Sequence, residues 1–232
     1  METSVIIVCA GNSTRMGGVN KILLPLGNRL VIGVTMQAFQ QCESVKEIII
    51  VAREADIPSI RAEADAAGIT KLTACTVGGD TRQQSVINGV RCASPDTELI
   101  AVHDGARPLV RPEHIEKTIR DAGVFGGAAL GVPVKDTIKM VEDGLITDTP
   151  PRKLLYITQT PQVFKRRLYF EGIDFALEHS LDFTDDCQLV EAIGGKIAMT
   201  TGDYTNIKIT TPEDIRLAEV LLGMRGEQLC SE

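Results

Sequence analysis

A loop of small and basic residues near the N-terminus contains the side chains best suited to chemistry. Residues 9–18 read CAGNSTRMGG, and Lys21 follows shortly after them. Glycine lets backbone N–H groups approach a ligand closely, and Arg15 and Lys21 add fixed positive charge to the same loop. This combination is typical of a phosphate-binding loop. A flexible connection with two solvated cations is the alternative interpretation.

The spacing within this loop excludes two common phosphate-binding motifs. The dinucleotide fingerprint needs Gly-x-Gly-x-x-Gly, but Gly11 is followed by Asn-Ser. The Walker loop needs Gly-Lys-Ser/Thr, but Gly17 is followed by Gly-Val. The remaining pattern, small residues ending in Arg-Met-Gly and then a basic residue, resembles the signature loop of sugar-nucleotide pyrophosphorylases and related nucleotidyltransferases.

A second set of polar residues follows an expected buried strand at 99–102. The next residues are His103 and Asp104, and Arg107 comes soon after. Open parallel sheets bind ligands beyond the carboxyl ends of their strands, so an acid and a base lie where a ligand would bind. Asp104 could hold Mg²⁺ or a ribose hydroxyl; the alternative is a salt bridge with Arg107 that shapes the turn. We expect a structural rather than a catalytic role for His103.

A third turn with ligand-binding character follows the expected strand at 71–77. Gly78 and Gly79 precede Asp80 and Thr81, either of which could cap the helix that is predicted to reach about residue 92. Three loops with polar or glycine-rich sequences therefore follow three expected strands.

The length and charge of the chain limit the classes of protein to which it could belong. At 232 residues it fits a single domain, 1–232, and its formal net charge of −7 argues against a general affinity for nucleic acid or anionic membranes. Any phosphate site must therefore be a local concentration of Arg and Lys.

The cysteines and the hydropathy pattern favour a cytoplasmic protein. The six cysteines form no Cys-x-x-Cys pair and match no His spacing, so we expect small buried residues in a reducing compartment. No apolar stretch reaches about 18 residues, and no signal peptide is recognisable. We therefore expect no membrane association.

Elsewhere, apolar runs alternate with helical periodicity, which predicts an α/β fold with flanking helices. Expected strands lie at 4–8, 47–51, 71–77, 99–102, 126–133, 196–200 and 206–209. Expected helices lie at 31–41, 57–67, 112–122, 166–179 and 211–222, and another ends near residue 193. Gly68 and Gly123 are the expected C-terminal caps, and we attribute the adjacent carboxylates Asp185 and Asp186 to a favourable interaction with a helix dipole. The chain from about Gly226 is expected to fray.

Residues 135–160 interrupt this alternation. Two short apolar segments, 139–141 and 145–147, flank the turn Glu-Asp-Gly, which predicts a β-hairpin. A polar hairpin of this size buries little of itself. We therefore expect it to project as an arm, either as a lid on its own site or as a clasp on a partner subunit. Residues 159–164 are expected only to lead from this arm back to the body.

Taken in order, the motifs resemble those of the 2-C-methyl-D-erythritol 4-phosphate cytidylyltransferase family. The resemblance covers about residues 4–222, and its combination of motifs is highly specific. The matching segments are Arg15-Met16 with Lys21, GGD-x-R-x-x-SV at 78–86, HD-x-ARP at 103–108, PV-x-DT at 133–137, QTPQ at 159–162 and NIK at 206–208.

This resemblance implies a fold, an activity and a set of roles. The fold would be Rossmann-like, of the nucleotide-diphospho-sugar transferase type, with a projecting β-hairpin arm that crosses a homodimer. The enzyme would join CTP to the sugar-alcohol phosphate with Mg²⁺ and release pyrophosphate, in non-mevalonate isoprenoid biosynthesis. The implied catalytic residues are Arg15, Lys21 and Lys208. The implied nucleotide-binding residues are Ala10, Gly11, Gly79, Asp80, Ser85 and Asp104, the last also near the metal. The implied residues for methylerythritol phosphate are Arg107, Thr160 and, from the partner's arm, Thr137 and Arg152.

The chain departs from the family pattern at four positions. Cys9 and Ser13 stand where the family usually has alanine and often glycine, and Gly105 and Tyr156 stand where many members have alanine and tryptophan. Ser13 affects how closely the main chain can approach the phosphates. The alternatives that remain open are a ribitol 5-phosphate cytidylyltransferase and a non-catalytic nucleotide-binding relative.

Overall fold

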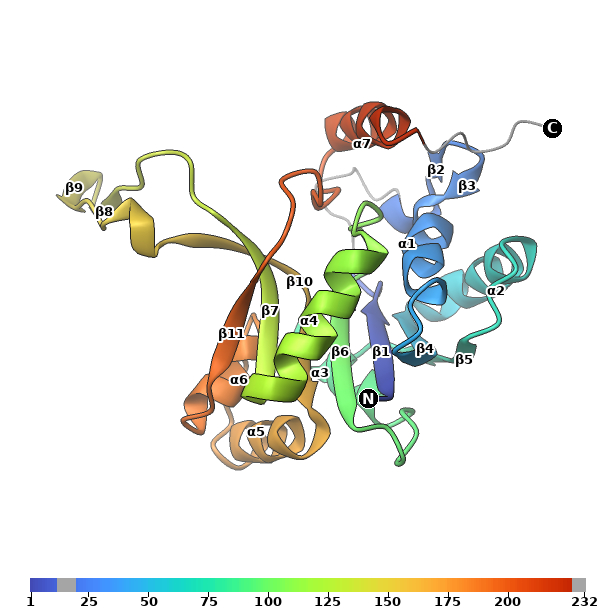
Figure 1. The fold of residues 1–232 in the computed structure, drawn as a ribbon, viewed down its shortest axis with the longest axis horizontal. Coiled ribbons are helices and arrows are strands. Elements are labelled where there is room, and N and C mark those ends of the chain that lie inside the picture. Colours follow the sequence, from blue (N-terminus) through green and yellow to red (C-terminus); the bar gives the residue numbers. More distant parts are fainter. Residues whose placement is uncertain (12–19, 227–232) are drawn as a thin grey trace.

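A computed structural model describes residues 1–11 and 20–226. Seven strands form one sheet in the order β11-β7-β10-β6-β1-β4-β5 (Figure 1). Its neighbouring strands are parallel except where β10 pairs with β6 and with β7. The strands are β1 (Thr3–Val8), β4 (Val45–Ala52), β5 (Leu72–Val77), β6 (Leu99–Asp104), β7 (Gly127–Pro133), β10 (Tyr156–Lys165) and β11 (Ile197–Thr201). The expected mostly parallel α/β fold is confirmed.

Helices cover both faces of this sheet (Figure 1). One apolar cluster includes residues of α1 (Val31–Gln40), α2 (Ile57–Ala66), α4 (Pro112–Phe125) and α7 (Pro212–Met224). The other includes residues of α3 (Arg82–Val90), α5 (Arg166–Glu178) and α6 (Asp186–Ala192). Val5 and Ile7 belong to the first cluster and Ile6 to the second, because side chains alternate across a strand. No helix within the described residues is long and apolar enough to cross a membrane.

Short elements connect the first strand to the helices. The 3-10 turn η2 (Lys21–Leu23) precedes a small hairpin of β2 (Pro25–Leu26) and β3 (Arg29–Leu30). A second 3-10 turn, η3 (Glu54–Asp56), joins β4 to α2. Both turns lie beside the carboxyl edge of the sheet, and both contribute residues to the site described below.

The C-terminal cap expected at Gly123 is wrong. Helix α4 continues through that residue to Phe125, and Gly126 is its C-cap, with φ +100°. Glycine is favoured at a helix end because it adopts positive φ without a Cβ clash. Gly126 meets that requirement, so the helix is three residues longer than expected.

The strand expected at 206–209 is also wrong, because the backbone of this segment bonds to a loop instead of to a strand. The amide of Ile209 donates to the carbonyl of Ala106 at 2.8 Å. The carbonyl of Asn206 accepts from Arg107 Nη1 at 2.9 Å. The segment is thereby attached to the loop after β6, which brings Lys208 to that loop.

Strand β10 replaces the connection that the sequence predicts over 159–164. It begins at Tyr156 and runs antiparallel between β6 and β7. Tyr156 pairs with Pro133, so the last residues of the expected arm, 156–160, belong to this strand.

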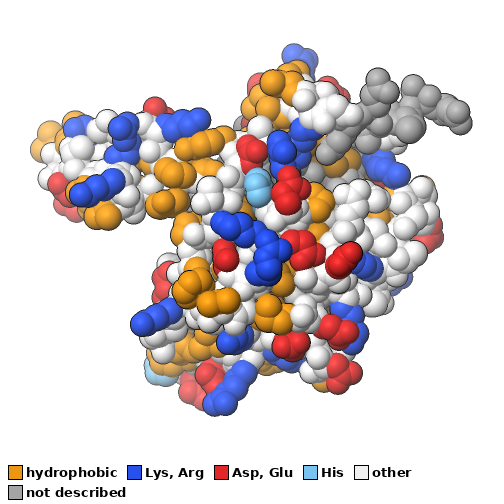
Figure 2. Space-filling model, viewed as in Figure 1, with side chains coloured by type: hydrophobic (Ala, Val, Ile, Leu, Met, Phe, Trp, Pro, Cys, Tyr) orange, Lys and Arg blue, Asp and Glu red, His pale blue; other side chains and the backbone are white. Residues whose placement is uncertain are grey.

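The expected hairpin is formed, and it projects from the body beyond β7 and β10 (Figure 1). It consists of β8 (Met140–Glu142) and β9 (Leu145–Asp148), followed by the 3-10 turn η4 (Arg152–Leu154). Figure 2 shows hydrophobic side chains gathered on this arm. Those exposed include Ile138, Met140, Val141, Leu145, Ile146 and Leu154. The arm comprises residues 134–155.

The cysteines within the described residues form no disulfide. Cys9, Cys42 and Cys187 are buried as expected, whereas Cys92 is exposed. The prediction of buried cysteines therefore holds for these three and is wrong for Cys92.

Candidate functional site

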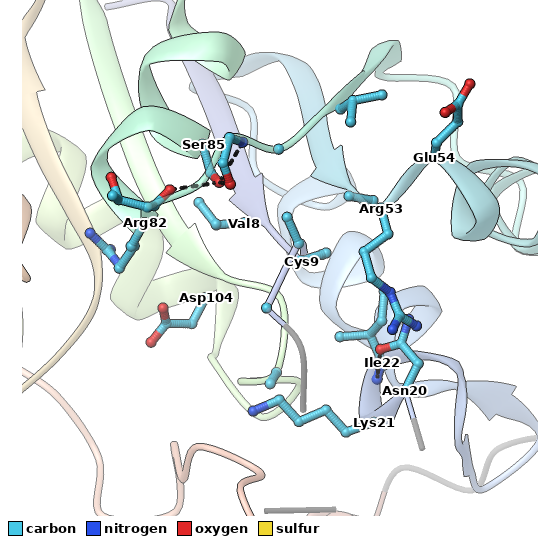
Figure 3. Close-up of a pocket in the computed structure, with 18 of the residues that line it drawn as sticks. Val8, Cys9, Asn20, Lys21, Ile22, Arg53, Glu54, Arg82, Ser85 and Asp104 are labelled. Carbon is cyan, nitrogen blue, oxygen red and sulfur yellow. Dashed lines mark hydrogen bonds between the residues drawn. The ribbon is translucent and has the colours of Figure 1, made fainter. Parts of the chain in front are cut away.

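A cavity of about 590 Å³ opens at the carboxyl ends of β1, β4, β5 and β6 (Figure 3). Of the residues that the sequence predicts for the site, Ala10, Gly11, Lys21, Gly79, Asp80, Ser85, Asp104 and Lys208 line it. The cavity thus lies at the edge where open parallel sheets bind their ligands, and the ends of four separate strands contribute to it. Arg15 lies outside the described residues.

One wall of the cavity is made where the ends of β1 and β5 approach each other closely. A Cβ added to Gly78 would overlap the Cβ of Ala10, so only glycine fits between the two loops. The amide of Gly79 donates to Ser85 Oγ at 3.0 Å, and that hydroxyl donates to the carbonyl of Thr81 at 2.9 Å. Ser85 thereby holds the glycine turn against the start of α3. The backbone of Gly78 and Gly79 therefore lines the cavity directly.

Asp104, at the end of β6, is the most strongly paired acid in the cavity. Lys208 Nζ and Arg107 Nε lie 3.0 Å and 3.2 Å from its Oδ2. Burial opposes the charge on this carboxylate, but Lys208, Arg107 and Arg82 outweigh it and hold the pKa of Asp104 well below its usual range. Asp104 therefore forms the salt bridge with Arg107 that was the alternative to a ligand-binding role, and it also lines the cavity.

A chain of hydrogen bonds behind Asp104 fixes its orientation. The Asp104 amide donates to Thr160 Oγ1 at 3.0 Å, and Thr160 Oγ1 lies 3.0 Å from His103 Nδ1. His103 Nε2 lies 3.2 Å from the carbonyl of Arg107 and must donate to it, so Nδ1 accepts from Thr160. Burial lowers the pKa of His103 to about 4, which keeps the ring neutral. His103 is therefore structural, as expected. The buried Thr160 hydroxyl is occupied as well, because it accepts from the Asp104 amide and donates to His103.

A partly buried ion pair holds Arg82 at the edge of the cavity, beside Asp104 (Figure 3). Arg82 Nη2 lies 2.6 Å from Asp186 Oδ2, and Tyr169 donates to Asp186 Oδ1 at 2.6 Å. Burial opposes the charge on Arg82, but Asp186 outweighs it and raises the pKa of the guanidinium. The helix-dipole interpretation therefore accounts for only one of the two adjacent acids. Asp185 caps α6 by accepting from the amide of Cys187, whereas Asp186 forms the ion pair with Arg82.

The two predicted site residues of the arm lie outside the cavity. Thr137 is exposed, and Arg152 Nη1 donates to the carbonyl of Lys135 at 2.7 Å. Because the arm projects away from the body, its residues are not brought together with the pocket residues of the same chain (Figure 1).

The residue-by-residue prediction missed a group of residues on the side of the cavity opposite Arg82. Asn20 and Arg53 line the cavity (Figure 3). Both contact the buried carboxylate of Asp56. A usable signal existed for Arg53, because it lies two residues after an expected strand, at 47–51, whose carboxyl end reaches the same edge. Nothing in the spacing links Asn20 to Asp56.

The described residues contain no group of three or more His, Cys, Asp or Glu side chains that could hold a metal ion by themselves. Mg²⁺, however, is usually held by one or two carboxylates together with substrate phosphates and water. Asp104 fits that requirement, because within the described residues both of its ion pairs are made by Oδ2, which leaves Oδ1 as a potential ligand. The cavity therefore fits Mg²⁺ that arrives with a phosphate ligand.

Comparison with known proteins gives one consistent result. The family model described as 2-C-methyl-D-erythritol 4-phosphate cytidylyltransferase matches residues 3–224. A protein of that name from Syntrophotalea carbinolica is 44% identical, over 98% of this chain and 99% of its own. Another, from Caldanaerobacter subterraneus, is 44% identical, over 96% and 99%.

Solved structures agree with the sequence relatives. The crystal structure of 4-diphosphocytidyl-2C-methyl-D-erythritol synthase from Anaerococcus prevotii matches with a TM-score of 0.85 and 31% identity, over 96% of each chain. That of 2-C-methyl-D-erythritol 4-phosphate cytidylyltransferase from Thermus thermophilus matches with a TM-score of 0.78 and 33% identity, over 95% of this chain and 98% of that one. The similarity thus extends over nearly the full length of these proteins.

Proposed function

This chain belongs to the 2-C-methyl-D-erythritol 4-phosphate cytidylyltransferase family, and we propose that the cavity at the carboxyl edge of its sheet is the active site. The enzyme joins CTP to methylerythritol phosphate in isoprenoid biosynthesis and releases pyrophosphate. The observation that carries the assignment of the site is Asp104, held between Lys208 and Arg107 at the base of a cavity that Lys21 also lines.

We assign the nucleotide to the wall formed by β1, β5 and α3. Ala10, Gly11, Gly79, Asp80 and Ser85 would contact the cytosine and the ribose, because all five line this wall of the cavity. Lys21 and Lys208 would lie along the triphosphate, together with Arg15.

The chemistry requires positioning and charge neutralisation rather than a general base. A phosphate monoester has a second pKa of about 6, so the attacking oxygen is mostly ionised at neutral pH. It attacks the α-phosphorus in line, and pyrophosphate leaves. Lys21, Lys208 and Arg15 would stabilise the charge that builds up on the transferred group. Neutral His103 takes no proton in this scheme, since its ring holds Thr160 and the loop after β6.

Mg²⁺ would be held by Asp104 together with the nucleotide phosphates, and when bound it would neutralise part of their charge. Lys208 and Arg107 keep the Asp104 carboxylate ionised, as metal binding requires.

We assign methylerythritol phosphate to the side of the cavity next to Arg107. Thr137 and Arg152 would complete this subsite from the arm of a second subunit, because the arm of each chain projects away from its own cavity (Figure 1). Thr160 would act by holding Asp104, since its hydroxyl is occupied by the Asp104 amide and His103. The proposed assembly is a homodimer, and the free cysteines agree with a cytoplasmic location.

Pyrophosphate release tests the assignment. With CTP and Mg²⁺, we expect turnover with methylerythritol 4-phosphate and little with ribitol 5-phosphate, and little when ATP, GTP or UTP replaces CTP. Lys21→Ala should fold and lose on the order of 10²-fold in kcat, as is usual when one transition-state charge is removed. Lys117→Ala, on the exposed side of α4, is the matched control. Wild-type turnover by Lys21→Ala would remove this lysine from the mechanism.

A further inference from the structure

Asp56 is a buried acid beside the active-site cavity that the mechanism above does not use. It is 6% exposed and lies at the N-terminus of α2, where an aspartate would usually cap the helix. Its side chain makes no capping hydrogen bond to that helix. The carboxylate oxygens are directed to two residues that line the cavity instead.

The two partners come from different parts of the chain. Asn20 Nδ2 donates to Asp56 Oδ2 at 2.6 Å. Arg53 Nε donates to the same oxygen at 2.6 Å, and Arg53 Nη2 donates to Oδ1 at 3.2 Å. Asp56 therefore joins the carboxyl end of β4 to the segment that precedes η2.

The Asn20 side chain has a second contact, which fixes the turn that carries Lys21. Asn20 is the N-cap of η2, and its Oδ1 accepts from the amide of Ile22 at 3.4 Å. One end of this amide thus caps the turn and the other end is held by Asp56. Lys21 is the first residue of η2, so it directly follows the residue that is held in this way, and both line the cavity (Figure 3).

We propose that Asn20 and Asp56 are positioning residues that hold Lys21 in place for the transfer reaction, with Arg53 fixing the Asp56 carboxylate. The proposal rests on the role assigned to Lys21 above. A displacement of about 1 Å in a catalytic group can cost up to about 10²-fold in rate, so a partly released turn should give a clear kinetic effect.

The first test uses single and double variants of the intact enzyme. Asn20→Ala should lower kcat about ten-fold with a smaller change in the KM for CTP, because Lys21 acts mainly in the transition state. In a Lys21→Ala background, Asn20→Ala should cause no further loss, because it acts through the missing lysine. Asp56→Asn should lower kcat in the same way, and Asp65→Asn, on the exposed side of α2, is its control.

A reciprocal exchange tests the hydrogen bond itself. Asn20→Asp places two carboxylates against each other and should be slower than Asn20→Ala. Asn20→Asp with Asp56→Asn restores one donor and one acceptor in reversed order, and we expect kcat to recover several-fold over Asn20→Asp alone.

The outcomes separate this proposal from the one on which it rests. Wild-type kcat for Lys21→Ala would overturn the role of the lysine. An inactive Lys21→Ala enzyme together with a wild-type kcat for Asn20→Ala, even with a lowered Tm, would overturn only the positioning role. The positioning role would also be overturned if the losses in kcat from Asn20→Ala and Lys21→Ala were fully additive. The same holds if Asn20→Asp with Asp56→Asn recovered no kcat over Asn20→Asp alone.

Discussion

Cys9, which lines the cavity, is packed against Gly105. The Cys9 side chain is 5% exposed, and a methyl group added at Gly105 would overlap its sulfur. Both residues depart from the family pattern, one toward a larger side chain and the other toward a smaller one. The larger side chain at Cys9 thus occupies the space that a side chain at position 105 would need.

This contact predicts a non-additive effect on stability. Gly105→Ala should lower the free energy of unfolding by about 1–3 kcal/mol, the usual cost of overpacking a core. In a Cys9→Ala background the same substitution should cost much less, because the sulfur that it would overlap is gone. Urea unfolding of the wild type, the two single variants and the double variant measures the coupling. Equal costs in both backgrounds would show that the clash is relieved elsewhere.

Both departures are visible in the sequence, but the contact between them is not. They lie 96 positions apart in the chain, and nothing in residue type or spacing indicates that β1 and the loop after β6 place them in contact. The same limit explains Asn20 and Asp56, whose hydrogen bond links two loops. Contact between loops depends on the packing of the strands that carry them.

At the scale of the element, the end of β6 depends on a buried neutral histidine. His103 has a pKa of about 4, whereas an unperturbed histidine has one of about 6.5. Between these pH values the unfolded chain binds a proton that the folded chain does not. The free energy of unfolding therefore falls as the pH is lowered through this window, and the loss ends near the folded pKa.

This predicts a stability profile that His103→Gln flattens. The histidine should contribute at most about 1.4 kcal/mol per pH unit between about pH 6.5 and 4. Urea unfolding at several pH values should give a smaller slope for His103→Gln than for the wild type, whatever its absolute stability. His179→Gln, at the exposed end of α5, is the control. An unchanged slope in His103→Gln would exclude His103 as its source.

The elements that sequence reasoning predicted correctly are those with a simple period. Apolar runs such as 47–51 indicate buried parallel strands. Thr211-Pro212 indicates the start of α7, where the structure has a capping box. Strand β10 was missed because Gln159, Thr160 and Gln162 are polar yet buried, and the pairing with β7 shifts register between Thr158 and Gln162. Hydrogen-bond partners in other elements, which the sequence does not reveal, make this burial possible.

At the scale of the whole molecule, the sequence predicted the edge of the sheet at which the cavity lies, but not which parts of the chain would be absent from that cavity. Parallel strands meet at one edge, so polar loops after β1, β5 and β6 had to converge. The arm obeys no such rule. Its hairpin could be predicted from the turn residues, but its direction depends on how β7 and β10 leave the sheet (Figure 1).

The arm exposes six large hydrophobic side chains, Ile138, Met140, Val141, Leu145, Ile146 and Leu154. Leu145 and Leu154 are 73% and 70% exposed, and an isolated two-stranded hairpin is marginally stable in water. Exposed apolar surface of this kind marks an interaction site. In the proposed homodimer, a partner would cover it and would receive Thr137 and Arg152 in its own active site.

Subunit exchange tests this shared site directly. Lys21→Ala removes a group from the body of the protein and Arg152→Ala removes one from the arm, so each variant alone should be nearly inactive. In a mixed dimer, one site lacks both groups, whereas the other combines an intact body with an intact arm. Equal mixing should therefore restore about a quarter of wild-type turnover, because about half of the dimers are mixed and each has one complete site.

The time course and the controls make this result specific. Activity should appear only as subunits exchange, and two preparations of Lys21→Ala, mixed in the same way, should stay inactive. Size-exclusion chromatography with light scattering reports whether each variant is still a dimer. If mixed dimers form and no activity returns, each active site is built from one chain, and Arg152 acts within its own subunit or not at all.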